Sequence, residues 1–217
     1  MAAYLIVVRS PFSVRRRRRT QNGERRTLNY LAHLFLAGRT PESLIGNLAG
    51  DFVKGPLRED RFTPGIRDGI RQHRAIDAFT DTHPEVAAFR RVLIPDHGHY
   101  SRVISDVFFD HFLAADFATY SDETLEEFVE RVFTAMNGQP LPGRLAYVFP
   151  RIPSWILSYR HIDGIRIALT NLSHRLSREP HLEDAVHHLI DSRGELERRF
   201  HRFFPDAMAF AKQYRNE

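Results

Sequence analysis

The segment IRQHRAIDAFTDTHPEV, residues 70–86, predicts a long helix with polar groups along one side. His73, Asp77 and Asp81 follow one another at intervals of four residues. Residues four apart on a helix lie on the same side, with Cβ atoms about 5–6 Å apart. His73 and Asp77 are therefore expected to converge on one ion, and Asp81 lies one turn further along if the helix continues that far.

Helical patterns extend from this segment through most of the chain. Apolar residues recur at helical intervals, as at Leu44, Leu48 and Phe52, and no strand-like alternation persists for five residues. Start signals divide the pattern into short helices, among them Pro41 in a favoured first-turn position and Ser121 as an N-cap. The helices are expected at residues 29–37, 42–55, 62–81, 101–120, 121–138, 154–176, 181–193 and 195–214, with another beginning at Pro84 and a proline-rich crossing at 139–153.

The composition indicates one globular domain. The chain has 217 residues, of which 42% are apolar and 12% aromatic, enough for a sizeable core. It contains no cysteine, which excludes disulfides, thiolate zinc sites, iron–sulfur clusters and a cysteine nucleophile. Any metal ion must therefore bind to oxygen and imidazole ligands. The expected fold class is all-α, a single compact multi-helix domain over residues 28–217.

Residues 1–27 carry most of the positive charge. They contain eight arginines and one glutamate, a net charge of +7, so the +4 of the whole chain leaves −3 on the rest. No sustained period occurs there, which predicts a disordered extension, with Leu28 as an alternative start. The arginine block 15–19 is interpreted as a solvated tail, so nucleic acid is not the expected partner. YLIVV precedes the arginines, unlike in a secretory leader, and no apolar run spans a membrane, so a cytoplasmic protein is expected.

Polar side chains also interrupt the apolar patterns of other helices. His33 interrupts NYLAHLFLA, and Asp51 interrupts LIGNLAGDFV. Asp110 and His111 together interrupt VFFDHFLA. An ionised carboxylate that is buried without a partner is costly, so each aspartate needs a cation, an arginine or several hydrogen-bond donors. A shared divalent ion would satisfy several of these groups at once.

Structural explanations compete with metal binding at each residue taken alone. His33 is alternatively a hydrogen-bonded core histidine, and Asp81 or Thr82 is alternatively a cap for the next helix. Asp77 is alternatively paired with Arg74 or Arg71 in a salt bridge. The metal hypothesis rests on the number of such groups, because several helices each place an acidic or imidazole side chain within an apolar surface. The histidines to which no chemistry is assigned are His97, His99, His187 and His188.

Oxygen and imidazole ligands without sulfur favour Mn²⁺, Mg²⁺ or Fe²⁺ over a structural zinc ion. Such an ion lowers the pKa of a bound water toward about 7 and neutralises phosphoryl oxygens. Metal-assisted hydrolysis of a phosphate ester is therefore the reaction class that these residues indicate. Arg74 lies about 100° round the helix from His73 and is either a forked contact to phosphate or a surface residue.

Four motifs, NYLAHLFLA, GNLAGDFVKG, GIRQHRAIDAFTDTHPEV and VFFDHFLA, occur in this order along the chain. Together they resemble the acyl carrier protein phosphodiesterase family, also called holo-ACP hydrolase. The likeness extends from Leu28 to the RRFHRFFPDAMAFA segment near the C-terminus. The family usually opens with methionine where this chain has Leu28.

The resemblance implies an all-helical fold related to the HD-type metal phosphohydrolases and a Mn²⁺-dependent activity. Enzymes of the family cleave the phosphodiester that joins 4′-phosphopantetheine to a serine of acyl carrier protein. The products are the apo-protein and free 4′-phosphopantetheine. Acyl carrier proteins are small and acidic, so a basic patch would steer them. The candidates for that patch are Lys54, Arg58, Arg61, Arg67, Arg71 and Arg74.

The family motifs also imply a set of site residues. Asp110 precedes His111, which is not the ordinary order of an adjacent His-Asp pair, so individual ligand roles stay open. Further candidates are His33 and Asp81. The residues expected to act on the substrate are Arg74, on phosphate, and His111, beside the ligands or as the general acid. His33 is the other candidate for the general acid. The residues expected around the metal ion are Asp51, His73, Asp77 and Asp110.

Two other functions fit the same residues. A phosphohydrolase of the same architecture could act on a nucleotide or another small phosphate ester, with no protein partner. A non-catalytic helical binding module would use the acids in structural ion pairs and residues 1–27 on nucleic acid. The sequence does not determine the number of metal ions, the acceptance of acylated carrier protein or the oligomeric state.

Overall fold

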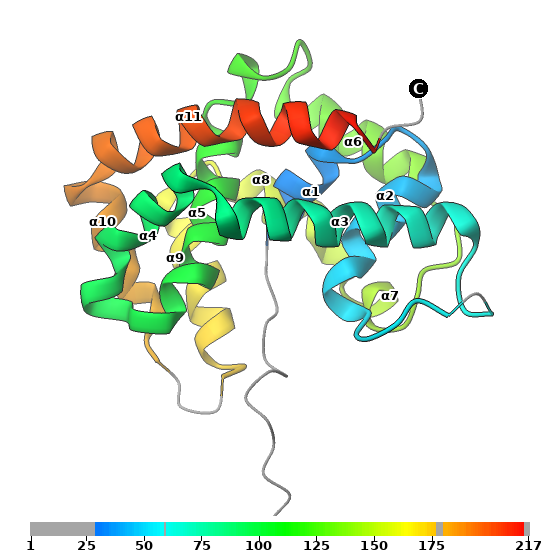
Figure 1. The fold of residues 1–217 in the computed structure, drawn as a ribbon, viewed down its shortest axis with the longest axis horizontal. Coiled ribbons are helices and arrows are strands. Elements are labelled where there is room, and N and C mark those ends of the chain that lie inside the picture. The colour runs from blue at the N-terminus through cyan, green and yellow to red at the C-terminus, as the bar shows by residue number, and fades with distance from the viewer. Residues whose placement is uncertain (1–28, 59, 177–179, 215–217) are drawn as a thin grey trace, which may run out of the picture.

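The computed structural model describes residues 29–58, 60–176 and 180–214, and the regular elements in these ranges are helices (Figure 1). No β-strand occurs among the described residues, so the all-α prediction is confirmed. The predicted extension 1–27 and the alternative start at Leu28 lie outside the described residues. None of the described helices is long and apolar enough to cross a membrane.

The helices are short and follow one another through brief turns. Single 3₁₀ turns join several of them, including η2 (Gly50–Phe52) and η5 (Phe149–Arg151). The α-helices are α1 (Tyr30–Leu36), α2 (Pro41–Ala49), α3 (Pro64–Thr82), α4 (Pro84–His97), α5 (Ser101–Ala115), α6 (Leu125–Met136), α7 (Arg144–Val148), α8 (Ile152–Ser158), α9 (Ile162–Ser173), α10 (Val186–Asp191) and α11 (Arg193–Lys212).

Helix α3 is the predicted helix with the polar stripe, and its start agrees with the sequence signals. Thr63 Oγ1 accepts a hydrogen bond from the amide of Ile66 at 3.4 Å, and Pro64 occupies the first turn. The apolar side of the helix buries Ile66, Ile70 and Ile76. Because polar and apolar residues lie on different sides of α3, burial of the apolar side fixes the rotation of the helix about its axis. This rotation places the polar stripe next to the neighbouring helices.

Two glycines let α2 pack closely against α3. A Cβ atom on Gly46 would lie 2.7 Å from the Cα atom of Gly69, and one on Gly69 would lie 2.7 Å from the carbonyl oxygen of Ser43. Contacts this short would push the helices apart. Asn47 Nδ2 donates a hydrogen bond to Gln72 Oε1 across the same interface at 2.9 Å. The close contact holds α2, and the η2 turn that follows it, against the polar stripe of α3.

Helix α5 runs through the core and contacts α1, α4, α8, α9 and α11, while α11 lies alongside α3 and α4 (Figure 1). Phe112 of α5 packs edge-on against Phe89 of α4, with ring centroids 6.2 Å apart, and stacks on Phe200 of α11 at 5.7 Å. Burial of each such side chain contributes about 1.5–3 kcal/mol. This packing fixes α5, which carries the buried carboxyl groups of Asp106 and Asp110.

Two predicted helix boundaries are wrong: the end of the helix expected at 42–55 and the N-cap of α6. The helix expected at 42–55 ends at Ala49, where the chain tightens into the η2 turn. The N-cap of α6 is Thr124 rather than Ser121, because Thr124 and Glu127 form a reciprocal capping box. The Glu127 amide donates to Thr124 Oγ1 at 3.2 Å, and the Thr124 amide donates to Glu127 Oε2 at 2.8 Å.

Three further predictions need correction. The proline-rich crossing at 139–153 contains α7 and η5, and the helix expected at 154–176 is divided by a turn into α8 and α9. Neither Asp81 nor Thr82 caps α4. The cap is His83, whose Nδ1 accepts a hydrogen bond from the second residue of α4 at 3.2 Å.

Candidate active site

Two histidines and an aspartate from α1 and α3 converge in a group that we call the buried cluster: His33, His73 and Asp77. Asp77 Oδ1 lies 3.2 Å from His33 Nε2, and its Oδ2 lies 3.3 Å from His73 Nε2. The two imidazole rings stack with centroids 3.8 Å apart. Ligand atoms of the three residues lie within 4.8 Å of one another. Both histidines are 2% exposed, whereas the Asp77 side chain is 42% exposed, so the cluster opens to solvent at Asp77.

A glycine makes room for one of these rings. A Cβ atom on Gly50 would lie 2.2 Å from carbon atoms of the His73 ring, so the imidazole rests directly on the glycine backbone. The η2 turn then presents Asp51, whose Oδ1 lies 3.7 Å from His73 Nε2. Asp51 is 9% exposed. The Gly-Asp pair of the GNLAGDFVKG motif therefore both admits the ring and adds a second carboxylate beside it.

Three of the four ring nitrogens in the cluster form no hydrogen bond within the described part of the chain that would compete with a cation. Both nitrogens of His33 and the Nδ1 of His73 are buried without a hydrogen-bond partner among the described residues. The approach of His33 Nε2 to Asp77 is close but is not a directed hydrogen bond. Buried polar atoms rarely lack a partner, and a cation would satisfy His33 Nε2. The oxygen and nitrogen donors therefore fit a divalent cation.

Charges within the cluster favour one protonated imidazole when no metal is bound. Burial favours the neutral form of His73, but Asp51 and Asp77 outweigh burial and raise its pKa to about 10. Burial and the nearby His73 lower the pKa of His33. Burial acts to raise the pKa of Asp77, but the two histidines hold it well below its usual range. A divalent cation therefore has to displace a proton from His73.

Asp106 is a buried carboxyl group near the cluster that the sequence interpretation missed. Its side chain lies on α5, is 10% exposed, and has Oδ1 3.7 Å from Arg90 Nη2. Burial raises the pKa of Asp106 to about 8, against the effect of Arg90. The charges of Asp77, Asp81 and Asp51 contribute to the same rise. Asp106 therefore lies close enough to the buried cluster to be affected by its charges. The protonated form of the Asp106 carboxyl group is favoured at neutral pH.

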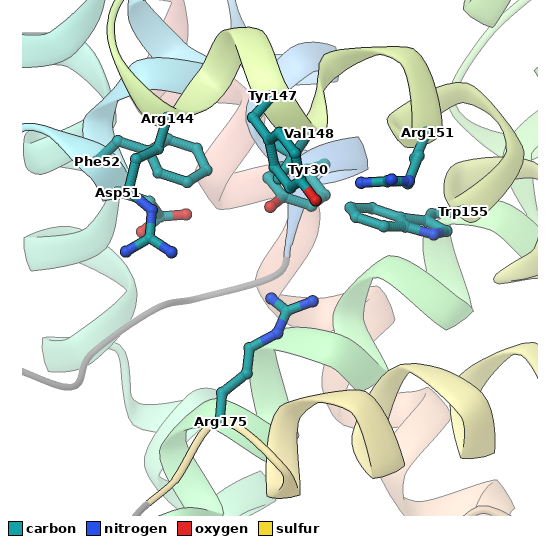
Figure 2. A pocket seen from close by; sticks show the side chains of 9 residues that line it. All are labelled: Tyr30, Asp51, Phe52, Arg144, Tyr147, Val148, Arg151, Trp155 and Arg175. Atoms are coloured by element: carbon teal, nitrogen blue, oxygen red, sulfur yellow. The ribbon is translucent and has the colours of Figure 1, made fainter.

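A cavity of about 230 Å³ adjoins the cluster at Asp51 (Figure 2). It is lined by side chains from α1, η2, α7, η5 and α8 and by one residue that follows α9. The lining includes three arginines and four aromatic side chains, one of which is Phe52 of η2. The others of these two kinds are Arg144, Arg151, Arg175, Tyr30, Tyr147 and Trp155.

The sequence model of the acyl carrier protein phosphodiesterase family matches residues 28–207. This chain belongs to that family. The acyl carrier protein phosphodiesterases of Escherichia coli strain K12 / DH10B and of E. coli O157:H7 are each 35% identical to it over 191 residues, which cover 86% of this chain and 98% of the relative. No solved structure matches the chain. The expected relation of the fold to the HD-type phosphohydrolases therefore stays a prediction.

Asp110, which the family motif suggested as a metal ligand, is bonded to the backbone of α1. Its Oδ2 accepts a hydrogen bond from the Leu31 amide at 2.9 Å and its Oδ1 one from the Ala32 amide at 2.8 Å. Burial nevertheless raises its pKa well above the usual range. Asp110 thus anchors the first turn of the helix that carries His33. Asp106 lies four residues earlier on the same face of α5, a spacing that could have identified it.

The two residues suggested for substrate contact have other partners in this structure. His111 Nδ1 lies 2.8 Å from the carbonyl oxygen of Tyr159, and burial lowers its pKa. Arg74 Nη2 donates a hydrogen bond to the carbonyl oxygen of Val53 at 2.9 Å, which ties α3 to the chain just after η2. Neither group joins the buried cluster.

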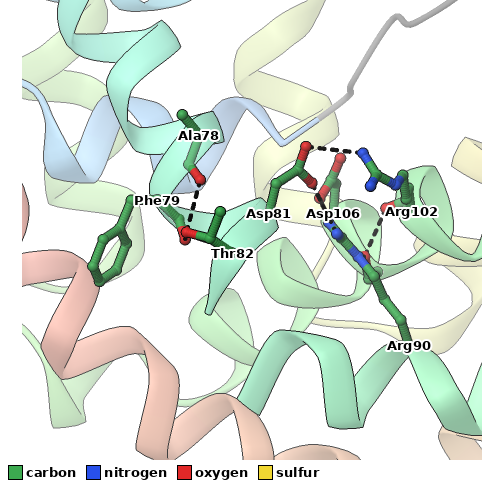
Figure 3. A network of polar contacts seen from close by, with 8 residues as sticks. Ala78, Phe79, Asp81, Thr82, Arg90, Arg102 and Asp106 are labelled. Carbon is green, nitrogen blue, oxygen red and sulfur yellow. Dashed lines mark hydrogen bonds and ion pairs between the residues drawn. The ribbon is translucent and has the colours of Figure 1, made fainter. Parts of the chain in front are cut away.

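Asp81, at the end of the polar stripe, faces two arginines (Figure 3). Its Oδ1 accepts a hydrogen bond from Arg90 Nη1 at 2.8 Å, and its Oδ2 one from Arg102 Nη1 at 2.9 Å. Arg90 also donates from Nε to Ser105 Oγ at 3.0 Å. Both oxygens of Asp81 are thus engaged in an ion-pair network that also includes Asp106, through Arg90.

Proposed function

We propose that this chain is a metal-dependent phosphodiesterase that releases 4′-phosphopantetheine from the serine of holo-acyl carrier protein. The observation that carries the proposal is the convergence of two buried imidazoles and a carboxylate from separate helices, beside an arginine-lined cavity. The choice of substrate is supported by relatives that match over 98% of their length and are named acyl carrier protein phosphodiesterases.

His33, His73 and Asp77 would hold the cation, which we expect to be Mn²⁺ because the donors are nitrogen and oxygen without sulfur. A cation bound there would activate water near neutral pH and offset charge on the phosphoryl oxygens. This assignment differs from the predicted ligands in two ways. His33 replaces Asp110, since both oxygens of Asp110 already accept backbone hydrogen bonds, and Asp51 is assigned to the attacking water instead of the cation.

The reaction breaks the bond between phosphorus and the serine oxygen, as water attacks the phosphorus atom. Asp51 lines the cavity, so its carboxylate can accept the proton that the attacking water loses. The serine oxygen must gain a proton as it leaves. Asp106, whose pKa burial raises to about 8, can hold that proton at neutral pH. We assign Asp106 the role of proton donor in place of His111, because it lies on the face of α5 that meets α1 through Asp110.

Mass spectrometry of the carrier protein tests the proposal directly. Incubation of holo-acyl carrier protein with the purified chain and Mn²⁺ should remove the mass of the prosthetic group and release 4′-phosphopantetheine. A chelator should stop the reaction, and added Mn²⁺ should restore it. An Asp77→Ala variant with wild-type circular dichroism should be inactive. Cleavage of nucleotides or other small esters without cleavage of the carrier protein would instead favour the small-ester phosphohydrolase.

A further inference from the structure

We infer that the cavity beside Asp51 is the binding site for the 4′-phosphopantetheine arm, an inference that rests on the proposed function. The phosphate lies on Arg144, and the pantetheine chain extends along Tyr147 and Trp155. Neither the family motifs nor the basic patch expected from the sequence includes these side chains. They lie on α7 and α8, in and beside the segment that the sequence suggested was a crossing.

The charge of the cavity favours an anionic ligand. Arg144, Arg151 and Arg175 are exposed, and none of them forms an ion pair with a carboxylate among the described residues. Asp51 is the one acidic residue among the lining side chains. A guanidinium group binds phosphate oxygens through paired, charge-assisted hydrogen bonds. Arginines without carboxylate partners can make these bonds at no loss of an existing ion pair.

The aromatic side chains suit the uncharged part of the arm. Tyr30 and Trp155 lie with ring planes 19° apart and centroids 6.1 Å apart. The guanidinium carbon of Arg151 lies 5.1 Å from the centroid of Tyr147, which is 74% exposed. The cation–π contact holds this exposed ring beside the cavity. Flat aromatic faces pack well against a slender chain of methylene and amide groups.

The arrangement of the lining residues sets the direction of the arm. Figure 2 shows Asp51 and Arg144 at one end of the cavity and Arg151 and Trp155 at the other. Phosphate on Arg144 would therefore lie beside the catalytic end, and the chain would run toward Trp155. The cluster opens to solvent at Asp77, which leaves room for the serine and the rest of the carrier protein.

The volume of the cavity is compatible with the arm. Small-molecule sites commonly enclose about 300–1,000 Å³, and this cavity measures about 230 Å³. Pantetheine is a linear chain whose branches are two methyl groups and a hydroxyl group near the phosphate, so it can extend along aromatic walls. The arm remains attached to the carrier protein through its phosphate, so the serine and the rest of the carrier protein stay outside the cavity.

The chain provides its own probe, because Trp155 is its one tryptophan. Metal-free protein is titrated with 4′-phosphopantetheine, with pantetheine and with inorganic phosphate, and tryptophan emission and calorimetric heat are both followed. We expect saturable binding of 4′-phosphopantetheine, with pantetheine about tenfold or more weaker because it lacks the charge-assisted contacts. Inorganic phosphate should bind more weakly than either and leave the tryptophan emission unchanged.

Variants of exposed residues separate the two halves of the site. Arg144→Gln should weaken 4′-phosphopantetheine about tenfold and leave pantetheine unchanged, whereas Tyr147→Ala should weaken both ligands. Arg198→Gln removes an exposed arginine of α11 and should change neither dissociation constant. Circular dichroism checks that each variant remains helical.

The outcomes for the cavity and for the reaction are distinguishable. Absence of saturable 4′-phosphopantetheine binding by both methods would overturn the inference, even if holo-carrier protein is cleaved. Equal effects of Arg144→Gln and Arg198→Gln would overturn the assignment of the phosphate position. Binding as expected, without cleavage of holo-carrier protein in Mn²⁺, would support the cavity assignment and refute the proposed function.

Discussion

The buried cluster has a counterpart near the end of α4, which we call the surface cluster and which consists of Asp96, His187 and His188. Asp96 Oδ2 lies 3.2 Å from His188 Nε2 and 3.6 Å from His187 Nε2. Its three ligand atoms also lie within 4.8 Å of one another. Two histidines and an aspartate therefore meet at two places among the described residues, and residue type and distance alone do not define an active site.

The surroundings separate the two clusters. The side chains of Asp96 and His187 are 54% and 47% exposed, and neither residue lines the cavity described above. Burial lowers the pKa of His188, and the neighbouring His187 and His97 add to this effect. In the buried cluster, two carboxylates instead raise the pKa of His73. Burial, converging carboxylates and an adjoining cavity are what distinguish the candidate active site.

The largest difference is expected from removing one histidine of each cluster. His73→Ala should lower kcat/KM for holo-carrier protein by about a thousandfold or more, because a bound cation contributes several kcal/mol to the transition state. His188→Ala should leave kcat/KM unchanged. Initial rates at saturating Mn²⁺, with circular dichroism as the folding check, measure both. Comparable losses in the two variants would eliminate the distinction between the clusters.

Replacement of Asp106, the buried acid beside the cluster, should have the next largest effect on activity. Asp106→Asn keeps the shape of the side chain but removes the proton donor, so kcat should fall about a hundredfold or more with little change in KM. Asp184→Asn, beside the surface cluster, serves as the matched control and should have no effect. A loss of stability alone would lower the unfolding midpoint and leave kcat of the folded enzyme unchanged, which would argue against the proton-donor role.

The glycine beneath His73 should matter somewhat less. Gly50→Ala places a methyl group against the imidazole, and a ring displaced by about 1 Å can cost about a hundredfold in rate. Mn²⁺ affinity should fall as well, as calorimetry would show. Gly194→Ala is the control, since its Cβ would lie 3.4 Å from the flexible end of Arg198. Wild-type Mn²⁺ affinity and activity in Gly50→Ala would show that the ring does not need this space.

The smallest expected effect is the change of stability and of Mn²⁺ affinity with pH. The folded-state pKa of His73, about 10, exceeds the ordinary value of 6.5. In metal-free protein its contribution to stability is therefore full below about 6.5 and is lost as the pH rises through 10. Mn²⁺ must displace this proton, so affinity should rise about tenfold per pH unit between pH 7 and 9.

Calorimetry in buffers of different ionisation enthalpy counts the proton released on Mn²⁺ binding. One proton per Mn²⁺ is expected at pH 7.5 for the buried cluster. His188 has a lowered pKa, so a metal ion bound at the surface cluster would release no proton from that residue. Binding without proton release in wild-type protein would place the metal elsewhere than on His73.

Local spacing predicted those parts of the site that lie on one helix. The interval of four between His73 and Asp77 placed both on one face of α3, as the structure shows. The same rule applied to α5 would have paired Asp106 with Asp110. The choice of Asp110 as a ligand came from its position in an apolar pattern and from the family motif. The hydrogen bonds of its carboxylate to α1 could not be read from either.

The sequence by itself determined the helical fold class, the polar stripe of α3 and the absence of thiolate chemistry, because periodicity and composition act over a few neighbouring residues. Tertiary packing decided that His33 reaches Asp77, that Gly50 lies beneath His73, and that arginines of α7 and η5 border the site. These contacts join residues far apart in the chain. Their geometry depends on how whole helices pack, which no local pattern specifies.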